Sequence, residues 1–194
     1  MPVTLEQLLE SRDNRVQHQK DLLGAYPGKS LLCLTVQLPG AEKRNDQSLA
    51  IAKAGVEAVR KAFVIEHEEL RDLETGYEAY FIVPMPPQDA KRLSCRIEDT
   101  HPLGRLMDID VICEPEPHPV SENHPVSENY FSGRDPKIIV SRSDIGLASR
   151  RCLLCGNEVR YCMRAKTHTT AELLNRIEQM LKEYELQAPN PRTD

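Results

Sequence analysis

The sequence predicts an α+β, or mixed α/β, fold in which helices pack on a central sheet. Helical and strand-like segments alternate along the chain, the apolar runs are far too short to span a membrane, and 40% of the 194 residues are hydrophobic. That length suits one domain with a proper core and is marginal for two. We therefore expect a single domain over residues 1–194, with a strand order that the pattern does not specify.

The N-terminal third of the chain predicts a helix, a strand and a second helix. In residues 5–23 leucines flank a charged middle, which is typical of a surface helix. Residues 30–38, "SLLCLTVQL", form an apolar, partly β-branched run closed by Pro39 and Gly40, which indicates a buried strand. Apolar residues at helical spacing over residues 47–63 predict a helix packed on the sheet.

Residues 77–113 predict a strand, a helix and another strand. The segment "YEAYFIVPM", residues 77–85, has strand composition. Pro87 suits the first turn of a helix that ends before Pro102, and the strand over residues 107–113 follows at once.

Residues 114–135 predict an exposed hairpin insertion. The segment is rich in Pro, Ser, Glu and Asn, and "HPVSEN" occurs at residues 118–123 and again at 124–129, so nothing here can bury a core. His118 and His124 are potential metal ligands, but mobile loops hold ligands poorly, and we interpret the repeat as an idle duplication.

The C-terminal part predicts the partner strand of that hairpin, "PKIIVS", and then an appendage over residues 150–186. This appendage consists of a cysteine- and histidine-bearing segment and the clearest helix in the chain. Thr169 and Glu172 form a capping-box pattern at the start of that helix, and an apolar stripe follows.

Overall charge and cysteine content restrict the function classes. A formal charge of −5 argues against a nucleic-acid-coating or membrane-binding surface. The start of the chain has no basic segment followed by an apolar core, so we expect a cytoplasmic protein whose six cysteines are reduced. Cys33, Cys95 and Cys113 lie in apolar segments and are most simply core residues.

Asp108 and Asp110 interrupt an otherwise apolar strand. Alternate residues of a strand share one face, so the two carboxylates are expected to lie together and to bind Mg²⁺ with substrate phosphates. Gly104 permits close approach of the backbone, and the guanidinium of Arg105 can donate two hydrogen bonds to phosphate oxygens. A D-x-D pair on a strand that follows a glycine is the arrangement used in nucleotidyl transfer. The alternative is an acidic, half-exposed edge strand.

Residues 142–166 reverse the acidic balance of the chain, with six basic residues against two acidic ones. This reversal predicts a polyphosphate-binding surface, and a solvated charged face is the alternative. The candidate phosphate-binding residues here are Arg142, Arg150, Arg151, Arg164 and Lys166.

Cys152, Cys155, Cys162 and His168 give the spacing C-x2-C-x6-C-x5-H. These are the ligand types of a tetrahedral zinc site, which would fix a segment too short to have its own core. Reduced thiols without a metal remain the alternative. Redox catalysis is disfavoured because no thioredoxin-like βαβ pattern adjoins the first pair.

The motifs "HPLGRLMDIDV", "RRCLLCGNEVRYCMRAKTH" and "LLESRDNRVQHQKDLL" resemble the holo-acyl-carrier-protein synthase of citrate lyase, also called apo-citrate lyase phosphoribosyl-dephospho-CoA transferase. The likeness covers nearly the whole chain. It implies transfer of the 5-phosphoribosyl-dephospho-CoA group from triphosphoribosyl-dephospho-CoA to a serine of the citrate lyase acyl carrier protein, with release of pyrophosphate. The duplicated "HPVSEN" and Met107 depart from the family pattern without touching this chemistry.

These observations lead to a nucleotidyltransferase-like enzyme as the favoured hypothesis. Asp144 is a candidate base for the serine hydroxyl, although an aspartate before Gly146 is at least as well explained as a turn residue. Arg12 and Arg15 of "SRDNR" are a second candidate surface for an acidic carrier. The alternatives are a nucleotidyltransferase that uses another donor and a non-catalytic, zinc-clipped basic binding module.

Overall fold

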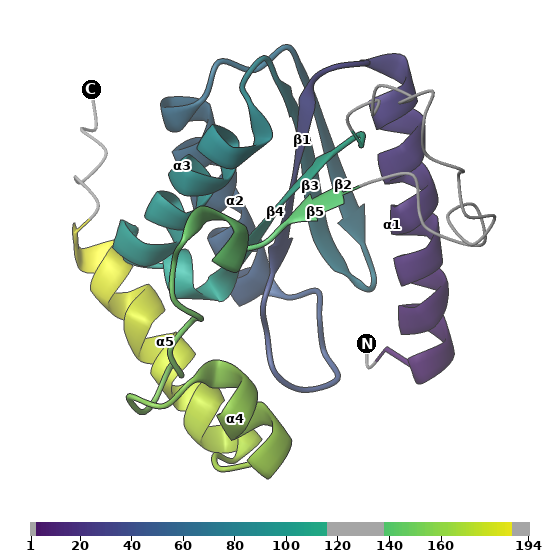
Figure 1. Ribbon diagram of the computed structural model, residues 1–194. Coiled ribbons are helices and arrows are strands. Elements are labelled where there is room, and N and C mark those ends of the chain that lie inside the picture. The colour runs from purple at the N-terminus through teal and green to yellow at the C-terminus, as the bar shows by residue number, and fades with distance from the viewer. Residues whose placement is uncertain (1–2, 116–137, 188–194) are drawn as a thin grey trace, which may run out of the picture.

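The computed structural model describes residues 3–115 and 138–187 (Figure 1). The helices are α1 (Leu5–Ala25), α2 (Asp46–Ala62), α3 (Pro87–Thr100), α4 (Val159–Ala165) and α5 (Thr170–Gln187). The strands are β1 (Ser30–Val36), β2 (His67–Leu73), β3 (Gly76–Val83), β4 (Met107–Cys113) and β5 (Ile138–Val140). Short 3-10 helices, η1 (Gly104–Leu106) and η3 (Ser143–Ile145), precede β4 and follow β5. Both "HPVSEN" copies of the predicted insertion lie outside the described residues.

The strands form one antiparallel sheet in the order β2-β3-β1-β4-β5. The α+β prediction is therefore confirmed, and the sheet is not the parallel one of an α/β fold. β1 lies in the middle because its first five residues are all buried and need cover on both faces.

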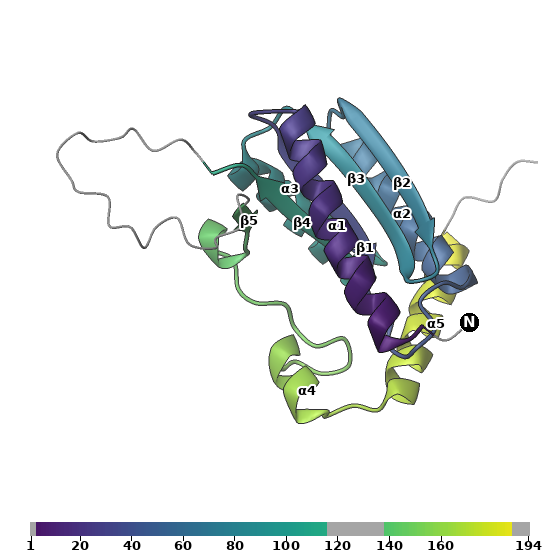
Figure 2. The same ribbon diagram turned by 90° about the vertical axis from the view of Figure 1, so that its right-hand side faces the viewer.

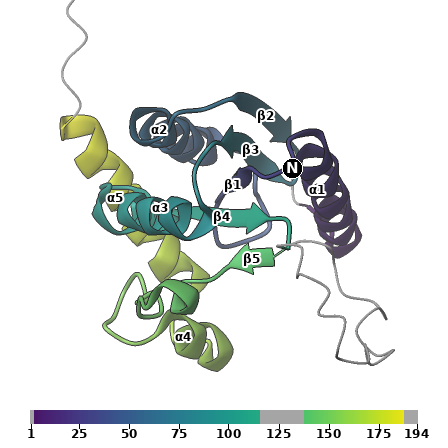
Figure 3. The same cartoon turned by 45° about the horizontal axis from the view of Figure 1, so that its top comes forward.

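Helices cover both faces of the sheet (Figure 3). The larger core lies on the face of α2 and α3, and α5 contributes Ile177, Met180 and Leu181 to it. α1 crosses the opposite face, as Figure 2 shows with β2 and β3 beside it. Burying an apolar face against each side of the sheet is the usual solution for such layers.

The sheet face below α1 is apolar at only one end of the strands. There the small second core consists of Leu22, Leu23, Leu31, Cys33, Tyr80, Ile82 and Ile112. Towards the other end, the register places Thr35 between Glu78 on β3 and Asp108 on β4. Paired residues of neighbouring strands share a face, so this end of the sheet presents polar groups.

Besides the two short 3-10 helices, β2 and α4 were not predicted from the sequence. The β2 sequence, "HEELRDL", is mostly charged because β2 is a sheet edge, where Arg60 and Arg44 pair with its Glu68 and Asp72. The other segments match the predicted ones to within a few residues, including the Thr169–Glu172 capping box before α5. In the described part of the chain, no helix is both long and apolar enough to cross a membrane.

Candidate active site

Asp108 and Asp110 occupy alternate positions of β4 on the sheet face that α1 covers only in part. Their neighbours Met107, Ile109 and Val111 are fully buried in the larger core on the opposite face. The apolar residues thus anchor the strand, and the alternation directs both carboxylates to the same side.

A cleft of about 620 Å³, here called the carboxylate cleft, opens in front of these two residues. Its charged lining residues are Lys91, Arg105, Arg142, Arg150, Arg160, Glu98, Asp108 and Asp110. Five basic groups against three acidic ones favour an anionic ligand. The carboxylate oxygens are the ligands that a hard divalent cation such as Mg²⁺ prefers.

Arg150 connects the carboxylate cleft to the core of the fold. Its Nη2 lies 3.3 Å from Oδ1 of Asp108, donates to the Met107 carbonyl at 3.0 Å, and pairs with buried Glu98. Burial lowers the pKa of Arg150, but the charges of Glu98 and Asp108 outweigh this and raise it above its usual value. Arg150 thus brings the basic segment into contact with Asp108.

Glu98 and Lys91 of α3 organise the cleft and were missed by sequence reasoning. β5 pairs with residues 111–113 only, so the backbone of Ile109 has no strand partner on that side. Lys91 Nζ donates to the Ile109 carbonyl at 2.9 Å, and the Ile109 N–H donates to Glu98 Oε1 at 2.8 Å. Their spacing of seven places both on one face of α3, but only the packing of α3 on β4 shows what that face meets.

Arg142 lines the cleft, and its positive charge is paired with carboxylates of the protein itself. Its guanidinium is 3.3 Å from Glu98 and 2.7 Å from Asp99, and its Nε donates to the Ala148 carbonyl at 3.0 Å. The hydrogen bond with Asp99 raises the pKa of Arg142. Glu98 thus binds two arginines, and Arg142 fastens the segment after β5 to α3.

The two aspartates differ in their surroundings. Asp108 Oδ2 accepts a hydrogen bond from Gln37 Nε2 at 3.1 Å, and Asp108 Oδ1 lies 3.3 Å from Arg150, whereas Asp110 stands further along the strand, opposite Cys33 of β1. Burial, followed by the charge of Asp108, raises the pKa of Asp110 above the ordinary aspartate value. A divalent cation between the two carboxylates would offset that repulsion.

Gly104 and Arg105 contribute differently from each other. A Cβ at Gly104 would lie 2.5 Å from the Ile97 carbonyl oxygen, so this glycine allows η1 to pack against the backbone of α3. Arg105 lines the cleft and donates to the Arg151 carbonyl. Burial and the nearby charge of Arg150 lower the pKa of Arg105, and among the described residues no carboxylate forms an ion pair with it.

Five predicted catalytic or phosphate-binding residues do not line the cleft: Gly104, Asp144, Arg151, Arg164 and Lys166. Asp144 accepts a hydrogen bond from the Ser141 N–H at 2.8 Å, which holds its pKa below the ordinary value, and it caps the turn at η3. Arg164 and Lys166 are exposed at the end of α4 and do not line the cleft. Arg160, one turn earlier on α4, lines it instead.

Cys152, Cys155, Cys162 and His168 converge at one point of the Cys/His segment, defined as residues 150–168. Their ligand atoms all lie within 4.8 Å of one another, an arrangement compatible with zinc. Exposed Arg151 precedes the first cysteine and donates to the Gly156 carbonyl at 2.7 Å.

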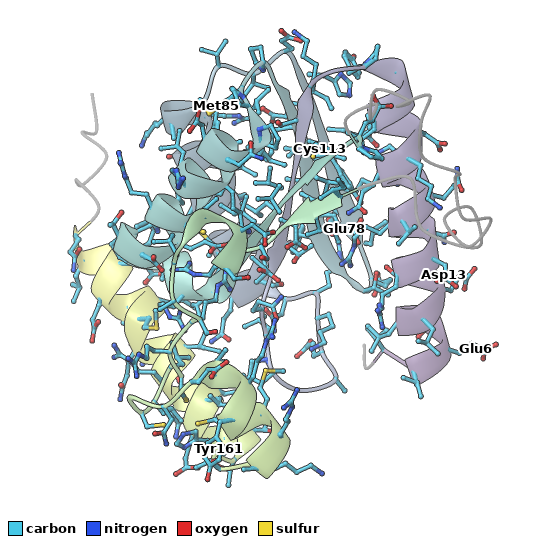
Figure 4. All side chains as sticks on the ribbon, in the orientation of Figure 1. Glu6, Asp13, Glu78, Met85, Cys113 and Tyr161 are labelled. Atoms are coloured by element: carbon cyan, nitrogen blue, oxygen red, sulfur yellow. The ribbon has the colours of Figure 1, made fainter. Side chains whose placement is uncertain are left out.

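The charged middle of α1 points partly at the sheet. Arg15 Nε donates to Glu78 at 2.7 Å, and Tyr80 also donates to this buried carboxylate. Figure 4 shows Glu78 between the sheet and α1. Of the two arginines considered for docking, Arg15 therefore has its charge matched internally, and Arg12 is exposed.

Comparison with known proteins identifies the family. The family model described as apo-citrate lyase phosphoribosyl-dephospho-CoA transferase matches residues 3–125 and 134–184. The chain belongs to the apo-citrate lyase phosphoribosyl-dephospho-CoA transferase family. The break in the match falls within the segment predicted to be an insertion, after the start of the second "HPVSEN" copy.

Individual relatives agree with this family assignment. An apo-citrate lyase phosphoribosyl-dephospho-CoA transferase of Escherichia coli is 33% identical over 188 residues, which cover 94% of this chain and 91% of that protein. A probable enzyme of the same name from Streptococcus pyogenes is 31% identical, with 94% and 87% covered. The chain is also 29% identical to protein CitXG of Haemophilus influenzae but spans 36% of its length. The family and these relatives indicate a transferase that acts on apo-citrate lyase.

Proposed function

We propose that the carboxylate cleft transfers a 5-phosphoribosyl-dephospho-CoA group from triphosphoribosyl-dephospho-CoA to a serine of the citrate lyase acyl carrier protein. The family match supports the activity. The main structural support for the mechanism is that Asp108 and Asp110 line the same cleft as Arg150, which pairs with Asp108. We assign the reaction to the nucleotidyl-transfer type, because a polyphosphate donor needs both a divalent cation and positive side chains.

In this mechanism Asp108 and Asp110 would hold Mg²⁺, and the bound ion would offset the charge of the donor phosphates. The serine oxygen attacks the phosphorus of the transferred group, the bond from that phosphorus to pyrophosphate breaks, and the hydroxyl proton passes to solvent. Arg105 and Arg150 bind the phosphate oxygens, so catalysis depends on positioning and on stabilisation of negative charge. We place the reaction in the cytoplasm, where free thiols such as the six in this chain persist.

The decisive experiment is mass spectrometry of the apo carrier protein after incubation with the chain, Mg²⁺ and each candidate donor. We expect the mass increase of phosphoribosyl-dephospho-CoA with triphosphoribosyl-dephospho-CoA, and none with ordinary nucleoside triphosphates. Asp108→Asn or Asp110→Asn should lower the rate by about 10³-fold, because each removes a charge that holds the metal.

Asp72→Asn is the matched control, because Asp72 is also a strand aspartate but lies on β2, at the other edge of the sheet. It should leave the rate unchanged. Full activity of either cleft variant would overturn the metal assignment, and modification with a nucleoside triphosphate would overturn the donor assignment.

A further inference from the structure

The Cys/His segment is ordered with little apolar burial. Within residues 146–176, all of which the structure describes, only Cys162 is buried. Tyr161 and Met163 of α4 are 61% and 72% exposed, and Figure 4 shows Tyr161 on this helix. Half-buried Leu153 packs against the larger core, but an isolated helix as short as α4 is not stable in water, so this segment needs a further source of stability.

The first two cysteines lie in a tight hairpin. The Cys152 N–H donates to the Asn157 carbonyl at 2.8 Å, and the Val159 N–H donates to the Arg150 carbonyl at 2.9 Å. Inside the hairpin, the Leu154 N–H lies 3.5 Å from the sulfur of Cys152. A backbone N–H directed at a cysteine sulfur stabilises the charge of a thiolate ligand.

The other two candidate ligands complete the group from α4 and from the residue just before the α5 cap. Cys155 Sγ lies 3.5 Å from Cys162 Sγ and 3.4 Å from His168 Nε2. In a tetrahedral site with metal–sulfur bonds of about 2.3 Å, neighbouring sulfur atoms are about 3.8 Å apart. The observed separations are close to this value, so only small side-chain shifts are needed to admit a metal.

We propose that Cys152, Cys155, Cys162 and His168 bind one structural Zn²⁺ ion. Three thiolates and one imidazole fill a tetrahedral shell and leave no open position for a substrate, so the metal stabilises the fold and takes no part in the chemistry. On binding, the three thiols release their protons to solvent and the neutral imidazole coordinates through Nε2. The metal thereby joins the hairpin, α4 and the start of α5.

The zinc site also positions the cationic wall of the carboxylate cleft. Arg150 and Arg151 immediately precede the first ligand; Arg150 reaches Met107 and Asp108, and the Arg151 carbonyl accepts from Arg105. Loss of the metal would therefore loosen the backbone that holds Arg150. This positioning role rests on the proposed function, whereas the metal site does not.

Metal content tests the site without any transferase assay. The full-length chain, produced in medium containing zinc and then dialysed, should hold about one zinc per chain by inductively coupled plasma mass spectrometry. Cys155→Ser should reduce this below about a tenth, and the matched control Cys113→Ser, a cysteine on β4 outside the group, should retain it. His168→Cys should also retain zinc, because it supplies a fourth thiolate.

A second measurement covers the case in which Cys155→Ser does not fold. Wild-type chain stripped of metal by a chelator and given Co²⁺ should develop the thiolate charge-transfer and tetrahedral d–d absorption bands of a cysteine-rich site. Wild-type chain without zinc and without these bands would overturn the proposal, as would a Cys155–Cys162 disulfide in the freshly isolated protein.

The positioning role has its own readout. Removal of zinc should raise the KM for the polyphosphate donor by about tenfold, with a smaller change in kcat, and added Zn²⁺ should restore it. If the protein contains zinc but its removal leaves the KM unchanged, the positioning role is wrong and the metal site still stands.

Discussion

The carboxylate cleft and the Cys/His segment differ in what holds their functional groups in place. In the cleft, the side chains of Glu98 and Lys91 are buried, and both bind the backbone of Ile109 on a strand whose other face is buried in the core. Most residues of the Cys/His segment lie on the surface, and its four potential metal ligands converge at one point.

This difference shows two ways of preorganising a site. A core can fix polar groups when their strand has one buried face, and the cost of burying charge is then offset by ion pairs. A segment without a core needs a metal or another cross-link. The two regions meet at Arg150, which pairs with Glu98 and Asp108, and at Arg151, whose carbonyl accepts a hydrogen bond from Arg105.

The strongest test of the core-fixed region is Glu98→Gln. The change leaves Arg142 and Arg150 without their shared buried carboxylate, so we expect the free energy of unfolding to fall by about 3 kcal/mol. Urea denaturation measures this loss. Asp99→Asn is the matched control, because Asp99 is the next residue and binds the same Arg142 at the surface; it should cost less than about 1 kcal/mol. Equal losses in the two variants would mean that Glu98 does not organise the cleft.

Arg150→Lys tests the contact between the two regions. A lysine cannot reach the Met107 carbonyl, Glu98 and Asp108 together, so transferase activity should fall by about 10- to 100-fold. Arg44→Lys is the control, because Arg44 makes a forked pair with Asp72 at the far edge of the sheet and should leave activity unchanged. A similar loss in both variants would indicate a general effect on folding.

Chelation of zinc should separate the two regions by amide hydrogen exchange. Without the metal, amides of residues 150–168 should exchange at least about tenfold faster, because few buried contacts oppose local opening. Amides of β1 and β3 should keep their protection, since both strands lie inside the sheet and away from the segment. Uniform loss of protection would show that the segment and the sheet form one cooperative unit.

The smallest expected effect is a gain of stability in Asp110→Asn. The pKa of Asp110 is raised in the folded chain, so its charge destabilises the metal-free fold at any pH above that raised pKa, and the penalty disappears as the pH falls below the ordinary aspartate value. Removing the charge should therefore stabilise the metal-free chain at neutral pH, by on the order of 1 kcal/mol. Thermal unfolding at several pH values measures it.

In the same thermal-unfolding measurements, Asp144→Asn should have the opposite effect on stability from Asp110→Asn. The pKa of Asp144 is lowered by its hydrogen bonds from Ser141, so its charge stabilises the fold at neutral pH and this contribution is lost in acid. This variant should lose stability at neutral pH. The same sign in both variants would contradict the two environments described for these aspartates.

Local sequence patterns predicted most of the elements of the fold. The apolar run of β1, the proline that opens α3 and the period-two pattern around Asp108 and Asp110 each act within a few residues, so they can be recognised without the rest of the structure. The pattern of β2 failed, because a charged edge strand has no apolar face.

The supporting residues of the cleft could not be predicted in this way. Glu98 and Lys91 act on Ile109 across a gap in strand pairing, and nothing local distinguishes them from solvated charges of a helix. Asp144 shows the reverse: its acidic side chain beside a basic segment suggested chemistry, and the structure uses it in a turn. In both cases the deciding contacts depend on tertiary structure.

The hydrogen bonds of Lys91 and Glu98 to the backbone of Ile109 affect how this protein behaves at high concentration. Where β5 stops short, β4 would otherwise offer a free backbone donor and acceptor to which a strand from another molecule could add. Lys91 and Glu98 occupy both groups with charged side chains. The pair that shapes the cleft therefore also protects the chain from edge-to-edge aggregation.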